Sequence, residues 1–345
     1  MGVTTVAVDP QADPPGRAEA DFFYTVPGAD YDATKEIAVK HNIDGIVTGQ
    51  MEKPLLLMSR LAQDLGLIFH SPEVTGRSLD KWLMKQSFIS RNIPCARGHL
   101  IQAGESVSRE STDDLSFPVI IKPKDAFSSR GVLKLASFND LIEHLDESRS
   151  YSSDGEIIVE EFLEGREFSV ESVTFRGETT VVQVTEKFIT KYPYTVEMGH
   201  LQPAGVTGEE RKGIEEIVKR AVRALGIDNS ASHAEVMLTA EGPKMIEVGA
   251  RLGGDFISSY LTLASTGVSM DRAAVQTALG IAPDLRKRHI RFSMIRYLGL
   301  EPGRCVKEIL PVRAVTDMPG VIFAWNYLRP GDVTTEITHS ALRHG

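Results

Sequence analysis

The sequence predicts an α/β and α+β protein, in which a small parallel α/β domain precedes a larger part made of hairpins and helices. In the first 75 residues, β-branched runs alternate with helical patterns, which is typical of a parallel sheet. Further along, apolar strands with Gly in their turns predict hairpins at 166–184 and 234–248. We expect four parts, an N-terminal α/β domain, a second part with a lid at about 118–158, a third part that carries the site, and a β-rich extension. Their ranges are 1–75, 76–160, 161–289 and 290–345.

The N-terminal domain is built from short strands and two helices. Strands are predicted at 3–8, 22–26 and 43–48, and helices at 31–41 and 54–66. The second helix has Pro near its start and Gly at its end, the expected asymmetry. A domain of this type normally begins with a strand and a helix before Val3, so the sequence either begins unusually or lacks its first elements.

The rest of the chain alternates helices and strands. Ser78 is a plausible N-cap for a helix over 78–92, with Asp80 in the first turn, where an acid suits the helix dipole. Strands are expected at 117–121 and 156–162, and helices at 137–148, 209–225 and 270–279.

Composition limits the classes of function. The 345 residues are 42% hydrophobic and 25% charged, as in an ordinary globular protein. The net charge of −9 argues against broad nucleic-acid or membrane-surface binding, so a polyanion must meet a local cluster of Lys and Arg. The two cysteines are far apart in sequence and support neither a disulfide framework nor a cysteine metal site. No apolar run is long enough to span a membrane and no signal peptide is visible, so a reducing cytoplasm fits best.

The hairpin at 234–248 carries one acid on each strand. If its register is centred on Glu241, Glu235 lies directly opposite Glu247. Like charges at opposed positions destabilise a sheet, and Mg²⁺ is usually held by one or two carboxylates plus substrate phosphates. Arg251 follows four residues later and offers a cationic fork for phosphate or carboxylate. The alternative is that both acids lie on a solvated face and repel weakly.

Lys122 follows an apolar strand and precedes a turn of small residues. Gly and Ser in that turn permit unusual backbone angles and accessible N–H groups, as a phosphate-binding loop requires. Arg130 adds positive charge. Taken alone, a Lys at this place is more often a solvated strand end, and the loop favours the phosphate site.

The segment EEFLEGRE at 160–167 is a candidate nucleoside site. Glu167 shares a strand face with Ser169 and Glu171, because side chains alternate along a strand. Its carboxylate could accept hydrogen bonds from a ribose, and the backbone near Phe162 could meet an adenine edge. Without the other motifs, the segment reads as an acidic connector.

These motifs occur in the order and spacing of the ATP-grasp enzymes, which the chain resembles over roughly 75–285. The resemblance implies an ATP-grasp fold preceded by a pre-ATP-grasp domain, with ATP and Mg²⁺ bound and Mn²⁺ as an alternative metal. It implies that Lys81 and Lys122 contact the phosphates, that Glu235 and Glu247 bind the metal, and that Arg251 stabilises an acyl-phosphate or its oxyanion. The implied ATP site further comprises Ser128, Ser129, Arg130, Gly131, Glu160, Phe162, Leu163 and Glu167.

Within the family, the chain looks most like the amino-acid and dipeptide ligases. The resemblance makes Glu197, His200, Gly253 and Gly254 substrate-site candidates, whereas we interpret His233 as structural. One departure is Gly249, where the family often has Asn two residues after the second metal acid. Gly has no side-chain oxygen, so one metal or phosphate contact is missing or passes to water, and a second metal is in doubt.

The resemblance implies an ATP-dependent carboxylate–amine ligase that activates a carboxylate as an acyl-phosphate and releases ADP and phosphate. Its catalytic residues would be Arg251 and Lys122, and its partners a small carboxylate and a small amine, with no nucleic acid or membrane. A homodimer stays open. The alternatives are a bicarbonate-activating carboxylase of the same fold and a nucleotide-binding module without turnover.

Overall fold

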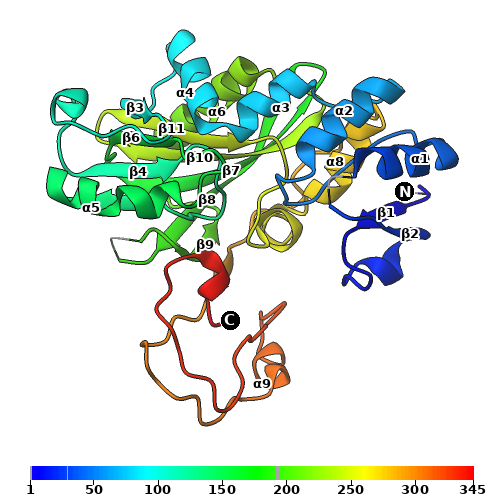
Figure 1. Cartoon of the computed structure of the whole chain (residues 1–345). Coiled ribbons are helices and arrows are strands. Elements are labelled where there is room, and N and C mark those ends of the chain that lie inside the picture. The colour runs from blue at the N-terminus through cyan, green and yellow to red at the C-terminus, as the bar shows by residue number, and fades with distance from the viewer. Residues whose placement is uncertain (1, 29, 192–193) are drawn as a thin grey trace.

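The computed structural model of the protein describes residues 2–28, 30–191 and 194–345. At the N-terminal end, strands β1 (Val6–Asp9) and β2 (Phe22–Thr25) pair in parallel, as expected. Helices α1 (Tyr31–His41) and α2 (Leu55–Leu65) pack beside them (Figure 1). Helix α2 begins after Pro54 and ends at Gly66, whose φ of 67° is left-handed. Residues at the ends of α2 therefore fix its length, as the sequence indicated.

The third strand expected at 43–48 is wrong. These residues are all described, and they form no strand. The segment instead lies against the end of helix α8 (Met270–Ala278). A Cβ atom on Gly45 would be 3.0 Å from the carbonyl oxygen of Ala278. The β-branched pattern of 43–48 thus reflects packing against a helix rather than sheet pairing.

The single helix expected at 78–92 is in fact two helices. Helix α3 (Pro72–Leu79) ends and α4 (Lys81–Ser90) begins at Asp80, which is extended. The Asp80 carboxylate accepts hydrogen bonds from the backbone N–H groups of Trp82 and Leu83 at 2.8 and 2.9 Å. Asp80 is therefore the N-cap of α4, and Ser78 lies inside the preceding helix. The break points the start of α4 toward the site.

A four-stranded antiparallel sheet forms the second part of the chain. Its order is β3-β6-β4-β5, with bounds Gly98–Ile101, Ile157–Glu161, Val119–Pro123 and Leu133–Leu135. Helix α5 (Phe138–Arg149), capped by the Ser137 side chain, packs on β4 and β5 (Figure 1). Val119, Ile121 and Leu141 are fully buried between them. Burial of these apolar side chains holds the sheet and helix together as one unit.

A six-stranded antiparallel sheet is the largest element of the fold. Its order is β11-β10-β7-β8-β9-β12. The bounds, from β7 to β12, are Arg166–Phe175, Glu178–Ile189, Glu197–Gln202, Ser230–Thr239, Gly242–Gly249 and Ser293–Arg296. Helices α3, α4 and α6 (Gly208–Leu225) lie above it in Figure 1 and pack on β11. The opposite face of its central strands therefore faces the smaller sheet.

Helix α6 shows how local sequence sets an element. Thr207 and Glu210 form a reciprocal capping box at its start, and Gly226, with φ of 81°, ends it. Its apolar side, including Ile214 and Val218, is fully buried against the large sheet. The predicted helix is confirmed, and its polar side faces away from the core.

The hairpin of β10 and β11 has the expected acid pair, but its turn is not centred on Glu241 as assumed for the register. Its turn is Ala240-Glu241, because Thr239 already pairs with Gly242. That register would place Glu235 one residue away from Glu247. A β-bulge between Glu235 and Val236 shifts the register by one residue, and Glu235 pairs with Glu247 after all.

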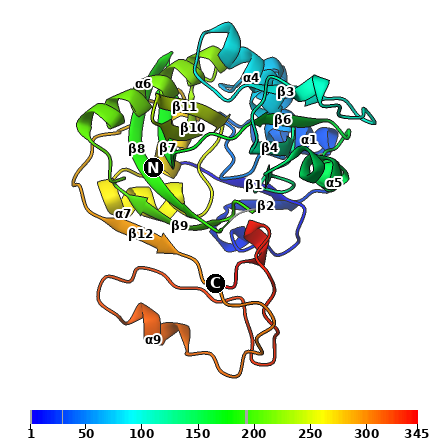
Figure 2. The same cartoon turned by 90° about the vertical axis from the view of Figure 1, so that its left-hand side faces the viewer.

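The last part of the chain holds less strand than we expected. After the π-helical turn Ile257–Leu261 and helices α7 (Thr262–Thr266) and α8, the range 290–345 contains β12, α9 (Val312–Thr316) and a turn at Ser340–Leu342. Most of it is an extended loop below the body of the protein (Figure 2). Proline and glycine turns therefore separate irregular segments here, and the description as β-rich is wrong.

Short 3₁₀ turns occupy Arg17–Glu19 and Glu110–Thr112. No helix in the described ranges is both long enough and apolar enough to cross a membrane.

Candidate active site

A cavity of about 470 Å³ lies between the two larger sheets. Its volume is in the range of small-molecule and cofactor sites. The small sheet contributes Lys122 and Glu160, the large sheet contributes Glu167, Lys187 and Glu235, and the N-terminal region contributes Gln50 and Glu52. The N-terminal region, the small sheet and the large sheet therefore each contribute side chains to one cavity.

A buried ion-pair cluster lies at the small-sheet end of the cavity. Lys122 Nζ lies 2.5 Å from one Glu160 oxygen, and Lys85 Nζ lies 2.9 Å from the other. Burial alone would lower the pKa of Lys122, but the Glu160 carboxylate raises it above its usual value. The pKa of Glu160 is lowered by the two lysines despite burial. Two cations on one carboxylate leave net positive charge, as a phosphate group requires.

Lys81 connects helix α4 with the turn after β4. Its Nζ donates to the Ala126 carbonyl at 2.6 Å and lies 3.5 Å from a Glu247 oxygen. Ser128 and Ser129 line the cavity with left-handed φ angles of 62° and 57°. Arg130 is exposed, and neither it nor Gly131 lines the cavity. The structure thus brings the lysine and the two serines together and leaves the other two loop residues outside.

Three carboxylates share one lysine on the large sheet. Lys187 Nζ lies 2.5 Å from Glu167, 2.9 Å from Glu235 and 3.3 Å from Glu197, and its side chain is only 3% exposed. Burial would lower the pKa of Lys187, but the three acids raise it well above its usual value, so the lysine stays charged. Lys187 was not among the predicted site residues, because nothing in the sequence distinguishes a single Lys within a β-rich run.

The expected nucleoside residues lie along one wall. Glu160, Phe162, Leu163 and Glu167 line the cavity. Lys134 Nζ lies 3.6 Å from the centroid of the Phe162 ring, which places a cation on that ring. Glu167 already pairs with Lys187, and burial raises the pKa of its carboxyl despite that cation.

The predicted metal acids share the cavity wall. Glu235 and Glu247 are register partners and both line the cavity. Burial would raise the pKa of Glu235, but Lys187 and His233 hold it well below its usual range, so this carboxylate is an anion. In the described part of the chain, no cluster of three or more His, Cys, Asp or Glu side chains forms a metal site. Two carboxylates are a donor set that suits an ion such as Mg²⁺, which usually takes its other ligands from phosphate oxygens and water.

Arg251 follows β11 and is held by an acid from the N-terminal region. Its Nε donates to Glu52 Oε1 at 2.6 Å, its Nη2 also contacts that oxygen, and its Nη1 donates to the Leu252 carbonyl at 2.8 Å. A Cβ atom on Gly249 would lie 3.4 Å from Arg251 Cζ, so the guanidinium lies against the glycine. The absent side chain at 249 thus provides room for the arginine.

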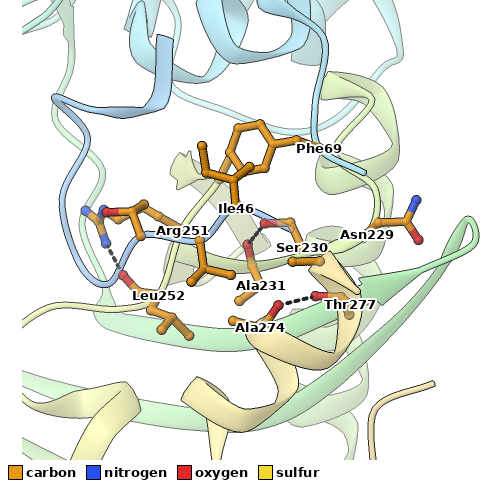
Figure 3. Close-up of a pocket in the computed structure, with 13 residues that line it drawn as sticks. Ile46, Phe69, Asn229, Ser230, Ala231, Arg251, Leu252, Ala274 and Thr277 are labelled. Atoms are coloured by element: carbon orange, nitrogen blue, oxygen red, sulfur yellow. Dashed lines mark hydrogen bonds between the residues drawn. The ribbon is translucent and has the colours of Figure 1, made fainter. Parts of the chain in front are cut away.

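A small pocket of about 20 Å³ lies behind Arg251, at the seam between the N-terminal segment and the large sheet. Figure 3 shows Ile46 and Phe69 on one side and Ala274 and Thr277 on the other, with the hydrogen bond from Arg251 to Leu252 at its edge. It is large enough for one water molecule at most. This pocket is therefore a packing feature of the seam and not a ligand site.

The expected substrate residues lie at the far end of the large cavity. Glu197, His200 and Gly254 line it together with Asp255, whose carboxylate lies 3.1 Å from His200 Nε2. Arg343 forms a bidentate pair with Asp255 at 2.7 and 2.6 Å. Burial would raise the pKa of Asp255, but Arg343 and His200 hold it well below its usual range. Neither Asp255 nor Arg343 was predicted, because their positions are far apart in the sequence.

Gly253 and His233 both contact the buried Glu171, and His233 also lines the cavity. Gly253 N donates to Glu171 at 3.2 Å and does not line the cavity. His233 Nδ1 lies 2.5 Å from Glu171, and both residues are buried. Burial would lower the pKa of His233, but Glu171 raises it to about 9. His233 is thus a charged partner of Glu171 that also lies 3.9 Å from Glu235, and its structural interpretation stays a prediction. Residues 192–193 of the segment 185–204, which carries Glu197 and His200, lie outside the described residues.

Comparison with known proteins assigns the fold. Residues 115–259 match the family model of the ATP-grasp domain. The chain is 26% identical over 317 residues to dapdiamide A synthase of Enterobacter agglomerans, covering 86% of this chain and 72% of that enzyme. It is 27% identical to a D-alanine–D-alanine ligase of Aromatoleum aromaticum, covering 61% and 67%. In fold it is similar to an L-amino acid ligase from Bacillus licheniformis, with a TM-score of 0.82 at 22% identity over 96% of this chain and 83% of that one.

Two antiparallel sheets that enclose a cavity lined with lysines and acids, together with this match, define a domain of the ATP-grasp type. The match places this ATP-grasp domain at residues 115–259 of the chain. The expected fold class is thereby confirmed.

Proposed function

We propose that the protein is an ATP-dependent ligase that joins the carboxylate of an amino acid to an amine and releases ADP and phosphate. The observation that carries the proposal is the pairing of Glu235 with Glu247 in the cavity that Lys81 and Lys122 also line. Relatives named as dapdiamide synthase and D-alanine–D-alanine ligase support the amino-acid substrate class.

The ATP phosphates are assigned to the end of the cavity with excess cations. Lys122 and Lys81 would contact them, and the turn at Ser128 and Ser129 would cover them. Glu235 and Glu247 would hold Mg²⁺, which neutralises phosphate charge when bound. Lys81 already lies between Glu247 and the turn, so it can pass from the carboxylate to a phosphate oxygen.

The reaction begins with attack of the substrate carboxylate oxygen on the γ-phosphate, a transfer that depends mainly on positioning and on charge neutralisation. The bond from the β-γ bridging oxygen to the γ-phosphorus breaks, and ADP leaves. The amine then attacks the acyl-phosphate carbonyl, and Arg251 would stabilise the oxyanion. Phosphate departs as the amide forms and the amine loses a proton. The part of the lid near 123–158 would exclude water, which otherwise hydrolyses an acyl-phosphate.

The substrate end is assigned to the wall formed by Glu197, His200 and Gly254. Asp255 pairs there with Arg343 and with His200, and Glu197 shares Lys187 with two other acids, so we assign substrate selection to this charged wall. Cytoplasmic location and a homodimeric assembly also remain proposals.

The test is a screen of amino acids, singly and in pairs, for phosphate release from ATP, with product mass measured for each hit. We expect phosphate release that depends on two amino acids and a product of their summed mass less water. Dependence on bicarbonate instead would support the carboxylase alternative. Nucleotide binding without turnover under any condition would support a module and overturn the ligase.

A further inference from the structure

The acid that holds Arg251 comes from a different part of the chain. Glu52 lies in the N-terminal region, 199 residues from Arg251 in sequence, and both side chains are mostly buried, at 15% and 13% exposure. Glu52 also lines the cavity. An ion pair at this depth is stronger than one at the surface, because water screens it less.

The geometry points to Glu52 as a positioning residue that orients the Arg251 guanidinium toward the cavity, and we propose that the N-terminal region thereby completes the active site. The inference rests on the proposed function, in which Arg251 meets the acyl-phosphate or its oxyanion. It assigns a role in the reaction to a part of the chain outside the ATP-grasp domain match at 115–259.

The hydrogen bonds define the orientation. Arginine has five N–H groups in a planar fork. Within the described structure, Nε and one N–H of Nη2 point to Glu52, and one N–H of Nη1 points to the Leu252 carbonyl. The contacts of Nε and Nη2 with Glu52, together with the contact of Nη1 with Leu252, hold two edges of the planar fork and so restrict rotation about the last side-chain bonds. One N–H on each Nη atom remains for an oxyanion.

Gly249 limits the positions that the Arg251 side chain can take. Its guanidinium lies against Gly249, where a Cβ atom would be 3.4 Å from Cζ and 3.5 Å from Nε. A side chain that extended beyond Cβ at 249 would have to share this space with the guanidinium. The glycine and the acid therefore act together, since one provides space for the arginine and the other fixes it there.

Glu52 is itself rigidly supported. Its carbonyl accepts a hydrogen bond from Leu55 N at 3.0 Å, which ties it to the first turn of α2. Leu55, Met58 and Leu61 of that helix are buried, at 1%, 4% and 1% exposure. Two residues before Glu52, the Gln50 side chain donates to Ser259 Oγ at 3.5 Å. The acid is thus supplied by a segment fixed at both ends.

Glu52→Gln tests the role, because the amide keeps the size of the side chain and loses its charge. We expect kcat for amino-acid-dependent phosphate release to fall about 10-fold to 100-fold, since misplacement of about 1 Å can cost that much. The ATP dissociation constant, measured with a fluorescent ATP analogue, should change less than twofold. Glu52→Asp should retain an intermediate kcat. The matched control is Asp64→Asn, which removes an exposed N-terminal ion pair with Lys35 and should leave kcat unchanged.

A second measurement separates orientation from general damage. If Glu52 acts through Arg251, Glu52→Gln should slow an Arg251→Lys variant no further. An unchanged or higher kcat in Glu52→Gln would overturn the proposal, as would additive effects in the double variant or an equal loss of ATP binding.

The NMR resonance of the Arg251 Nε–H group provides a test that does not depend on turnover. It is assigned as the signal that disappears in Arg251→Lys. It should shift or broaden in Glu52→Gln and stay in place in Asp64→Asn. If the wild-type protein forms no amide, the proposed function fails, and this resonance still decides whether Glu52 orients the arginine.

Discussion

Replacement of Lys187 by methionine would remove the lysine that contacts all three of Glu167, Glu197 and Glu235. Methionine has nearly the same length, so the cavity wall keeps its shape while the charge disappears. The lysine side chain is 3% exposed, and the three acid side chains are 16–17% exposed. The perturbation therefore acts on electrostatics more than on packing.

The cost follows from leaving buried carboxylates without their partner. Removal of one member of a buried ion pair typically costs 3–5 kcal/mol. The acids keep some contact with water, so we expect the lower end, about 3 kcal/mol of unfolding free energy at pH 8. Without the cation, the pKa values of the acids in the folded state should rise above their unfolded values of about 4.3. A group with a raised folded pKa loses stability as pH increases through that interval, so the deficit should be smaller at pH 5 than at pH 8.

Urea unfolding followed by circular dichroism at both pH values measures the effect. Lys212→Met is the matched control, because Lys212 is exposed on α6 and its loss should cost less than about 0.5 kcal/mol. A loss below about 1 kcal/mol for Lys187→Met, or a deficit that grows toward pH 5, would refute the reasoning.

Three further changes test other parts of the site and fold. Glu247→Gln should abolish turnover but change the unfolding free energy by less than about 1 kcal/mol, because Glu247 is 30% exposed and, among the described residues, forms an ion pair with Lys81 alone. Activity that survives in the presence of Mg²⁺ would contradict the metal assignment. Lys122→Ala should raise the ATP dissociation constant by about tenfold, roughly 1.4 kcal/mol, and an unchanged constant in a calorimetric titration would count against the phosphate site. Burial lowers the pKa of His70 from 6.5 to about 4, so stability should fall as pH decreases between these values, by about 1.4 kcal/mol per pH unit from this residue. His70→Gln should flatten that dependence in thermal unfolding, and an equal slope in both proteins would show that other groups cause it.

Local patterns in the sequence were sufficient for most helices and for the hairpin. Thr207 and Gly226 mark the ends of α6 by capping chemistry that acts within one turn. The acid pair was predicted in its correct register, although a bulge and a shorter loop produce it. The prediction succeeded because two local departures from the assumed hairpin cancel.

The missing parts of the site depend on contacts across the chain. Lys187, Glu52 and Arg343 each meet an acid or a base that is at least 48 residues away, namely Glu235, Arg251 and Asp255. Their charges have no periodicity or neighbouring motif that marks them. The failed strand at 43–48 has the same cause, since its apolar residues pack on α8 rather than on another strand. Tertiary packing overrides a local β pattern in such cases.

The bulge beside Glu235 separates the tip of the hairpin from its base. Ala240 and Glu241 are exposed. The residues between them and the bulge pair in a register that is shifted by one residue from the register at Glu235. A reporter peptide inserted at the tip would therefore extend into solvent without rotating either glutamate away from its neighbour. The hairpin thus offers an attachment point for a fluorophore a few residues from the catalytic centre.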